Sequence, residues 1–259
     1  MTVRFIFLVT ALTTSIFAAV PKSPDPRIIV ELFAEAPQIV TPTGLAVDPN
    51  GRVLVIESHT HFRPKDYKGP DRDRVLMFTI NSKGKTNRTI FHDGLNMGMD
   101  VTAGMNGWIY LAERNRILRV RDTDDDGKAD KYEDVIVMET NGTYPHNGLS
   151  GLSFAPSEID RRIIDAKGDL IFGLGENLGH AYTLFGRDGV KIEGAAGIGG
   201  GVFRCTIDGK KLKQIARGFW NPFGTCVDKW GRIFAVDNNP GGRPPCRLLH
   251  VVPKGDYGY

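Results

Sequence analysis

One short phrase occurs four times along this chain of 259 residues. Each copy is a glycine, an apolar strand, a glycine-containing turn and a second apolar strand: GLAVDPNGRVLVIES from Gly44, GMDVTAGMNGWIYLAER from Gly98, GLSFAP with KGDLIFGLGEN from Gly151, and GTCVDKWGRIFAVDN from Gly224. The copies start 54, 53 and 73 residues apart. Repeats of this length with several strands each are typical of a β-propeller. The pattern therefore predicts an all-β chain with about four recognisable blades.

Further strands are expected after two of these pairs. RVLMFTI and KTNRTIFHDG follow the first pair, and GGVFRCTID and KLKQIARGF follow the third, with turns such as SKG, RDG and IDG between strands where a positive φ is needed. Residues 157–167 could form a short helix or simply lengthen a hairpin loop. Because a propeller must close its first blade on its last, we expect residues 21–259 to be an incomplete part of a six-bladed ring. The alternative is an unusually small propeller.

The N-terminus has the pattern of a secretory signal. Arg4 precedes an apolar run from Phe5 to Val20, which is short for a membrane span, and Pro21 follows it. We expect residues 1–20 to be a signal peptide and the mature chain to be periplasmic or on the cell surface; a retained N-terminal anchor is the alternative. The net charge is only +3, without a basic run that contains aromatic residues, which argues against nucleic acid as a partner.

Three cysteines, Cys205, Cys226 and Cys246, lie in the last quarter of the chain. After export, one pair could form a disulfide and leave one thiol over, or all three could be buried thiols. The chain contains no C-x-x-C-H motif, so it carries no signal for c-type haem attachment.

The most charged stretch, RDTDDDGKADKYED, holds seven acidic residues. Its spacing matches the calcium loop D-x-D-x-D-G-x5-E, in which alternate short carboxylates converge and glycine permits the sharp turn. The predicted ligands are Asp122, Asp124, Asp126, the carbonyl of Lys128, Asp130 and Glu133. The flanks read as strands rather than helices, so the ion would pin a loop between blades. The alternative is a solvated hairpin whose Asp side chains bond their own backbone.

Two stretches resemble a known family. PHNGLSGLSFAP with GDLIFGLGENLG, and RGFWNPFGTCVDKWGRIFAVDNNP, are similar to conserved segments of the glucose/sorbosone dehydrogenases, which are soluble quinoprotein propellers. HTHFRPKDYKGPDRDRVL, DTDDDGKAD, FWNPFG and PPCRLLHVVPKGDYGY resemble, over nearly all of the mature chain, the N-terminal propeller of a bacterial membrane-bound dehydrogenase group. In that group a cytochrome c-type domain commonly follows, which implies a cytochrome c as electron acceptor.

The resemblance implies oxidation of a sugar or another alcohol with pyrroloquinoline quinone (PQQ). The family's general base falls on His146, and imidazole suits that role because its pKa lies near working pH. The family's asparagine falls on Asn221, and the carbonyls that hold the cofactor's calcium fall on Asn239 and Pro240. Trp220 stands where the family has an arginine, which removes a contact to the PQQ carboxylates. Arg243 could replace that contact, and Trp220 could stack on a flat ring or a sugar.

Four acids follow the second strand of their repeats: Glu57, Glu113, Glu176 and Asp237. Since equivalent positions of a propeller gather at one end of the channel, we expect them to form an acidic ring, with Glu176 and Asp237 joining His146 and Asn221 in the catalytic pocket. His59 and His61 are spaced to bind a metal only if other ligands join them; otherwise they belong to a loop at the propeller mouth. The leading hypothesis is a PQQ-dependent dehydrogenase-like propeller, and the alternative is a propeller that only binds carbohydrate or a protein partner.

Overall fold

The structure is a computed structural model that divides into two compact units, and it describes residues 21–82, 84–155, 168–238 and 246–259. The first unit ends at Gln38, and its described residues form turns and bends without a regular strand. The second unit, Ile39–Tyr259, holds the strands. The predicted signal peptide and the predicted helix or loop at 157–167 lie outside the described residues.

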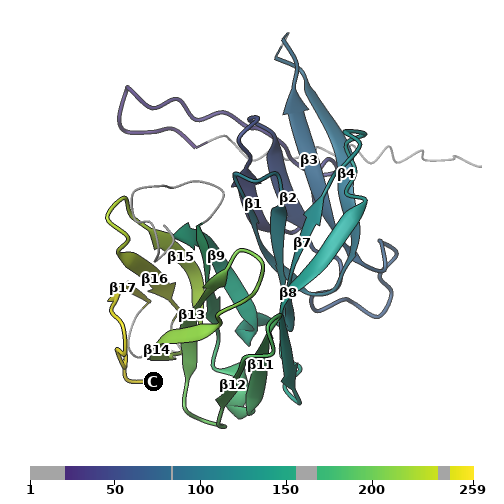
Figure 1. Cartoon of the computed structure of the whole chain (residues 1–259). Helices are drawn as coiled ribbons and strands as arrows, with labels where there is room; N and C mark the ends of the chain where they lie inside the picture. Colours follow the sequence, from purple (N-terminus) through teal and green to yellow (C-terminus); the bar gives the residue numbers. More distant parts are fainter. Residues whose placement is uncertain (1–20, 83, 156–167, 239–245) are drawn as a thin grey trace, which may run out of the picture. The chain divides into compact units, whose positions relative to one another are not determined.

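The second unit is built from four antiparallel sheets (Figure 1). The first sheet has the order β1-β2-β3-β4, with β1 at Pro42–Val47, β2 at Val53–Glu57, β3 at Asp73–Ile80 and β4 at Thr86–Leu95. The second has the order β12-β11-β8-β7-β6-β5, with β5 at Gly98–Ala103, β6 at Ile109–Glu113, β7 at Arg116–Arg121, β8 at Lys131–Thr140, β11 at Tyr182–Gly186 and β12 at Lys191–Gly194.

The other two sheets come from the C-terminal half. The third has the order β14-β13-β10-β9, with β9 at Leu149–Ala155, β10 at Asp169–Leu174, β13 at Gly200–Thr206 and β14 at Lys213–Phe219. The fourth has the order β15-β16-β17, with β15 at Pro222–Val227, β16 at Ile233–Asp237 and β17 at Arg247–Val251. Two single-turn 3₁₀ elements, η1 (Pro145–Asn147) and η2 (Asn177–Gly179), precede β9 and follow β10.

The four sheets are arranged as propeller blades. Each copy of the repeated phrase supplies the first two strands of its sheet: β1 with β2, β5 with β6, β9 with β10, and β15 with β16. The first strands lie next to one another in chain order, β1 beside β5, β5 beside β9, and β9 beside β15. The predicted all-β propeller class is therefore confirmed, including the third and fourth strands expected in the first and third blades.

Hydrophobic cores lie between consecutive blades. Within β6, Ile109 and Leu111 pack toward the first blade, whereas Tyr110 and Ala112 pack toward the third. Strand side chains point alternately to opposite faces, so a strand between two blades buries both sets. This explains why the second strand of each copy reads as a continuous apolar run rather than as an alternating one.

An inserted hairpin links the second and third blades. The strands β11 and β12 come between β10 and β13 in sequence, yet β11 pairs with β8 of the second blade, where Leu184 lies opposite Met138. Tyr182 and Leu184 contribute to the core between the two blades. The hairpin therefore extends the second blade to six strands.

Two further features bear on the sequence predictions. All three cysteines are free thiols, but only Cys205 is buried, whereas Cys226 and Cys246 are exposed, so neither sequence alternative holds in full. The described residues contain no helix long and apolar enough to cross a membrane.

Candidate functional site

A pocket of about 820 Å³ lies where the third and fourth blades begin. It is lined by Tyr144, His146, Asn147, Leu178, Trp220, Asn221, Phe223 and Asn238. His146 belongs to η1 just before β9, and Asn221 precedes β15 directly. Because β9 and β15 are adjacent first strands, the segments that enter them meet at one end of the propeller. The structure thus brings His146 and Asn221 together in one pocket.

The two residues are joined by a direct contact. Asn221 Nδ2 donates to the carbonyl oxygen of His146 at 3.0 Å. Asn221 is 1% exposed, and its Oδ1 is buried without a hydrogen-bond partner among the described residues. An unpaired buried acceptor is costly, so a ligand donor at this point would recover free energy. Burial lowers the pKa of His146, which favours the neutral imidazole that a base requires.

Glu176 and Asp237 lie behind the pocket wall. Glu176 Oε1 accepts from Asn147 Nδ2 at 3.2 Å, and its Oε2 accepts from the backbone N–H of Gly179 at 2.8 Å. Asp237 accepts from the backbone N–H of Asn221 at 2.7 Å and from Arg247 Nη2 at 2.5 Å. Neither carboxylate lines the pocket. Glu176 therefore holds the side-chain amide of Asn147 in place, and Asp237 holds the backbone N–H of Asn221.

The same arrangement occurs in the other blades. Glu57 accepts from the backbone N–H of Val40, and Glu113 accepts from that of Asn96, each just before the first strand of its own blade. The expected acidic ring is therefore not what these carboxylates form. Each one turns back into its own blade, because the segment entering the first strand presents N–H groups that the sheet leaves unpaired.

Aromatic and cationic side chains complete the surroundings. The ring of Trp220 stacks on that of Tyr259, with centroids 5.4 Å apart, and Tyr259 donates its hydroxyl to Glu176 Oε2 at 3.1 Å. The buried Arg114 donates from Nε to the carbonyl of Tyr144 and from Nη2 to Asn177 Oδ1, both at 2.7 Å. This guanidinium donates to neutral oxygens of Tyr144, Asn115 and Asn177, and burial lowers its pKa. Arg114 thus fixes the segment that carries His146.

The two histidines of the SHTHF stretch have separate partners. His59 Nε2 lies 2.9 Å from Glu57 Oε2, and its Nδ1 contacts the hydroxyl of Tyr67. His61 Nε2 lies 3.0 Å from His146 Nε2. Among the described residues neither joins a cluster of three or more metal-ligating side chains. They are loop histidines, as one of the two sequence alternatives expected, and His61 reaches the candidate site.

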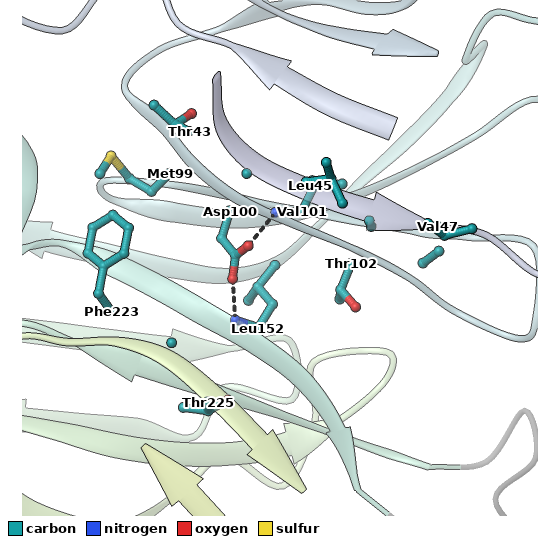
Figure 2. A pocket seen from close by; sticks show the side chains of 14 residues that line it. Thr43, Leu45, Val47, Met99, Asp100, Val101, Thr102, Leu152, Phe223 and Thr225 are labelled. Atoms are coloured by element: carbon teal, nitrogen blue, oxygen red, sulfur yellow. Dashed lines mark hydrogen bonds between the residues drawn. The ribbon is translucent and has the colours of Figure 1, made fainter. Parts of the chain in front are cut away.

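A second pocket, of about 470 Å³, lies between the first strands (Figure 2). Asp100 of β5 points into it, and its carboxylate accepts from the backbone N–H of Val101 at 2.8 Å and of Leu152 in β9 at 2.6 Å. Burial raises the pKa of Asp100 to about 6, although these N–H donors and that of Gly151 lower it. A carboxylate therefore ties the second blade to the third near the channel.

The acidic loop connects β7 and β8. Asp122, Asp124 and Asp126 lie within 4.8 Å of one another, and Asp122 Oδ1 is buried without a partner among the described residues. Ala129 N–H donates to the carbonyl of Phe91 at 2.7 Å, so the loop docks on β4 of the first blade. This position between blades agrees with the predicted role.

The last predicted ligand, Glu133, is not part of this carboxylate group. It lies in β8, where Glu133 Oε2 accepts from Arg119 at 2.6 Å and from Arg187 at 2.7 Å. Asp130 bonds the backbone and hydroxyl of Thr123 across the hairpin. Glu133 is therefore not retained among the predicted calcium ligands, because its carboxylate is already paired with Arg119 and Arg187.

Sequence reasoning did not single out several pocket residues. Tyr144 and Asn147 flank His146 in the motif, so their neighbourhood was a usable signal. Leu178 lies in η2, Phe223 lies in β15 and Asn238 directly follows β16, and none of the three has a distinguishing sequence pattern. The predicted cofactor contacts Asn239, Pro240 and Arg243 lie outside the described residues.

Comparison with known proteins supplies a family and a fold. Residues 25–256 match the family described as "Domain of unknown function (DUF7133)". No curated protein matches the chain in sequence. Among solved structures, the PQQ-bound aldose sugar dehydrogenase of Streptomyces coelicolor is similar with a TM-score of 0.52 and 18% identity, over 85% of this chain and 63% of that one.

Two other solved structures show the same likeness. The apo-form of the soluble aldose sugar dehydrogenase of Escherichia coli gives a TM-score of 0.51 at 16% identity, over 85% of this chain and 63% of that one. The calcium structure of the Trichoderma reesei carbohydrate-active enzyme of family AA12 gives 0.51 at 14% identity, over 85% and 56%. The chain thus spans less than two thirds of the length of these structures, and identities this low show the fold alone.

Proposed function

The chain belongs to the DUF7133 family, and from the pocket between its third and fourth blades we propose that it is an exported, PQQ-dependent dehydrogenase acting on a sugar or another alcohol. The observation that carries the proposal is that His146 and Asn221 meet in one pocket with Asn221 Oδ1 unpaired. The fold shared with sugar dehydrogenases supports it.

The pocket residues fit part of such a cofactor. Asn221 Oδ1 offers an acceptor to an N–H or hydroxyl group, and Trp220 offers an aromatic wall for a flat ring. Among the described lining residues there is no lysine or arginine for the carboxylates of PQQ. Arg243 is the cation we propose for that contact, and Asn239 and Pro240 are the proposed carbonyl ligands of the cofactor's calcium.

The chain's own residues then perform the proton chemistry. Bound PQQ would supply the hydride acceptor. His146, neutral at working pH, takes the proton of the substrate hydroxyl. Asn221 holds the backbone of His146, while Asp237 holds the backbone of Asn221. Glu176 orients the side chain of Asn147, the residue after the base. The two acids therefore act through the amides they position.

Two further proposals concern metal ions and partners. We place a Ca²⁺ ion at Asp122, Asp124 and Asp126, with the Lys128 carbonyl and Asp130 as further ligands, where it would hold the loop against the first blade. A cytochrome c is the proposed electron acceptor.

The same four blades would form part of a larger ring, since β1 leaves Leu45 and Val47 exposed and the fourth blade leaves Val236 and Leu248 exposed.

One observation favours the rival function of a propeller that only binds. The described pocket lining lacks a cation, and aromatic side chains surround the base: the Phe62 ring lies 5.3 Å from that of His146, and the Tyr144 ring lies 5.2 Å from it. Aromatic surfaces bind sugars and protein partners without chemistry. This rival predicts sugar or protein binding without turnover.

The two functions are separated by titration with PQQ and Ca²⁺ followed by dye reduction against a panel of sugars and alcohols. The dehydrogenase proposal expects saturable PQQ binding and substrate-dependent dye reduction. Binding of a sugar by calorimetry, with neither PQQ binding nor dye reduction, would support the binding propeller instead.

A further inference from the structure

His61 and His146 form an imidazole pair across two blades. His61 follows β2 of the first blade, whereas His146 lies in η1 at the entrance to the third. Their Nε2 atoms are 3.0 Å apart, and the two rings are inclined by 71°. Phe62 and Tyr144 pack against the His146 ring, with centroid separations of 5.3 and 5.2 Å. These two rings also contact each other, with centroids 5.9 Å apart, so the His146 ring borders a small aromatic cluster.

The two rings do not meet end to end. Rings joined along one straight N–H···N bond would have their centroids about 5 Å apart, since each ring extends behind its nitrogen. The observed separation is 4.1 Å. The N–H···N contact is therefore bent rather than straight.

The surroundings of His61 decide where its proton lies. Its Nδ1 is buried and has no hydrogen-bond partner among the described residues. A buried N–H without an acceptor is rarer in proteins than an under-used acceptor. Neutral His61 therefore carries its proton on Nε2, the atom that faces His146.

We infer that His61 is a positioning residue for His146: its Nε2–H donates to Nε2 of His146 and confines the proton of neutral His146 to Nδ1. The role in catalysis rests on the proposed function, because it assumes that His146 is the base. The Nε2 lone pair of His146 is thereby held unprotonated, and a substrate hydroxyl would take the place of His61 as its hydrogen-bond partner.

The charges around the pair agree with this arrangement. Burial and the neighbouring His146 lower the pKa of His61, whereas the Asp73 carboxylate raises it. Burial lowers the pKa of His146 as well. Protonating His146 on Nε2 would bring two N–H donors face to face, which opposes protonation at that nitrogen. Glu57, the last residue of β2, is bonded to His59 instead.

The test reads the position of the proton directly and needs no cofactor. The full chain is labelled with ¹⁵N in its six histidines, and two-bond ¹H–¹⁵N spectra assign the tautomer of each imidazole. We compare wild type with His61→Phe, which keeps a ring without a donor, and His61→Gln, which keeps a donor. His59, bonded to Glu57 and Tyr67, is the internal control for an intact first blade.

The expected spectra are specific. In wild type and His61→Gln, His146 carries its proton on Nδ1; in His61→Phe, the Nε2–H form becomes the major one. A wild-type His146 protonated on Nε2, or a His61→Phe spectrum that keeps Nδ1–H, would overturn the inference. Dye reduction is scored separately. If the spectra are as expected but the loaded wild type shows no turnover, only the proposed function is refuted. If His146→Ala abolishes turnover but wild-type His146 carries its proton on Nε2, only the inference is refuted.

Discussion

The carboxylate that ties the second blade to the third makes folding stability depend on pH. Burial raises the pKa of Asp100 from 3.8 to about 6. A carboxyl whose pKa is higher in the folded state binds its proton more tightly there. Its contribution is therefore fully present below pH 3.8 and is lost as the pH rises through about 6. A shift of about 2 units corresponds to about 3 kcal/mol of unfolding free energy.

The variant Asp100→Asn isolates this contribution, because its side chain has nearly the same shape and stays uncharged. Its amide can accept from only one of the N–H groups of Val101 and Leu152, which adds an offset that does not depend on pH. We expect the difference in unfolding free energy, wild type minus variant, to fall by about 2.5 kcal/mol between pH 4 and pH 7, because part of the effect is already lost at pH 4. Urea unfolding at half-unit pH steps measures it. A difference that is constant, or that rises with pH, would show that the backbone donors outweigh burial and refute the reasoning.

Three further predictions concern the loop and the pocket. Asp126→Ala should remove one Ca²⁺ site in calorimetry and abolish a Ca²⁺-dependent stabilisation of about 2.7 kcal/mol at a hundredfold excess over Kd; equal Ca²⁺ binding by both proteins would contradict it. Arg114→Met should cost about 2–3 kcal/mol in chemical unfolding, because the Tyr144 carbonyl and Asn177 lose a charged donor; an unchanged midpoint would count against that role. Gly175→Ala should cost about 1–3 kcal/mol, since its Cβ would lie 2.7 Å from Asn147 Cα and 2.8 Å from Asn221 Oδ1; full stability with unchanged PQQ binding would contradict the tight packing of the site.

The sequence predicted the parts of the fold that repeat locally. The glycine–strand–turn–strand phrase located the first two strands of all four blades, because its pattern is contained in one hairpin. It also placed His146 and Asn221 in one pocket, since both precede first strands. The hairpin β11–β12 could not be assigned in this way. Its pairing with β8 in another blade leaves no mark in its own residues.

Where the structure differs from the sequence prediction, the cause is a contact that the sequence pattern does not reveal. Glu133 fits the spacing of a calcium loop, yet Arg187 from the inserted hairpin and Arg119 from β7 bond it. Glu57 and Glu113 occupy equivalent strand ends, but each accepts a backbone N–H of its own blade instead of facing the channel. Likewise, His61 approaches His146 only through the packing of two loops.

The central claim is that His146 is the base of a PQQ-dependent dehydrogenase. The direct measurement is the rate of dye reduction by the Ca²⁺- and PQQ-loaded protein with its best sugar or alcohol, for wild type, His146→Ala and the control His250→Ala on the exposed surface of β17. We predict that His146→Ala lowers the rate by about 10²–10⁴-fold while His250→Ala leaves it unchanged. Rates for His146→Ala that equal those of wild type, or no turnover by loaded wild type on any substrate, would contradict the account.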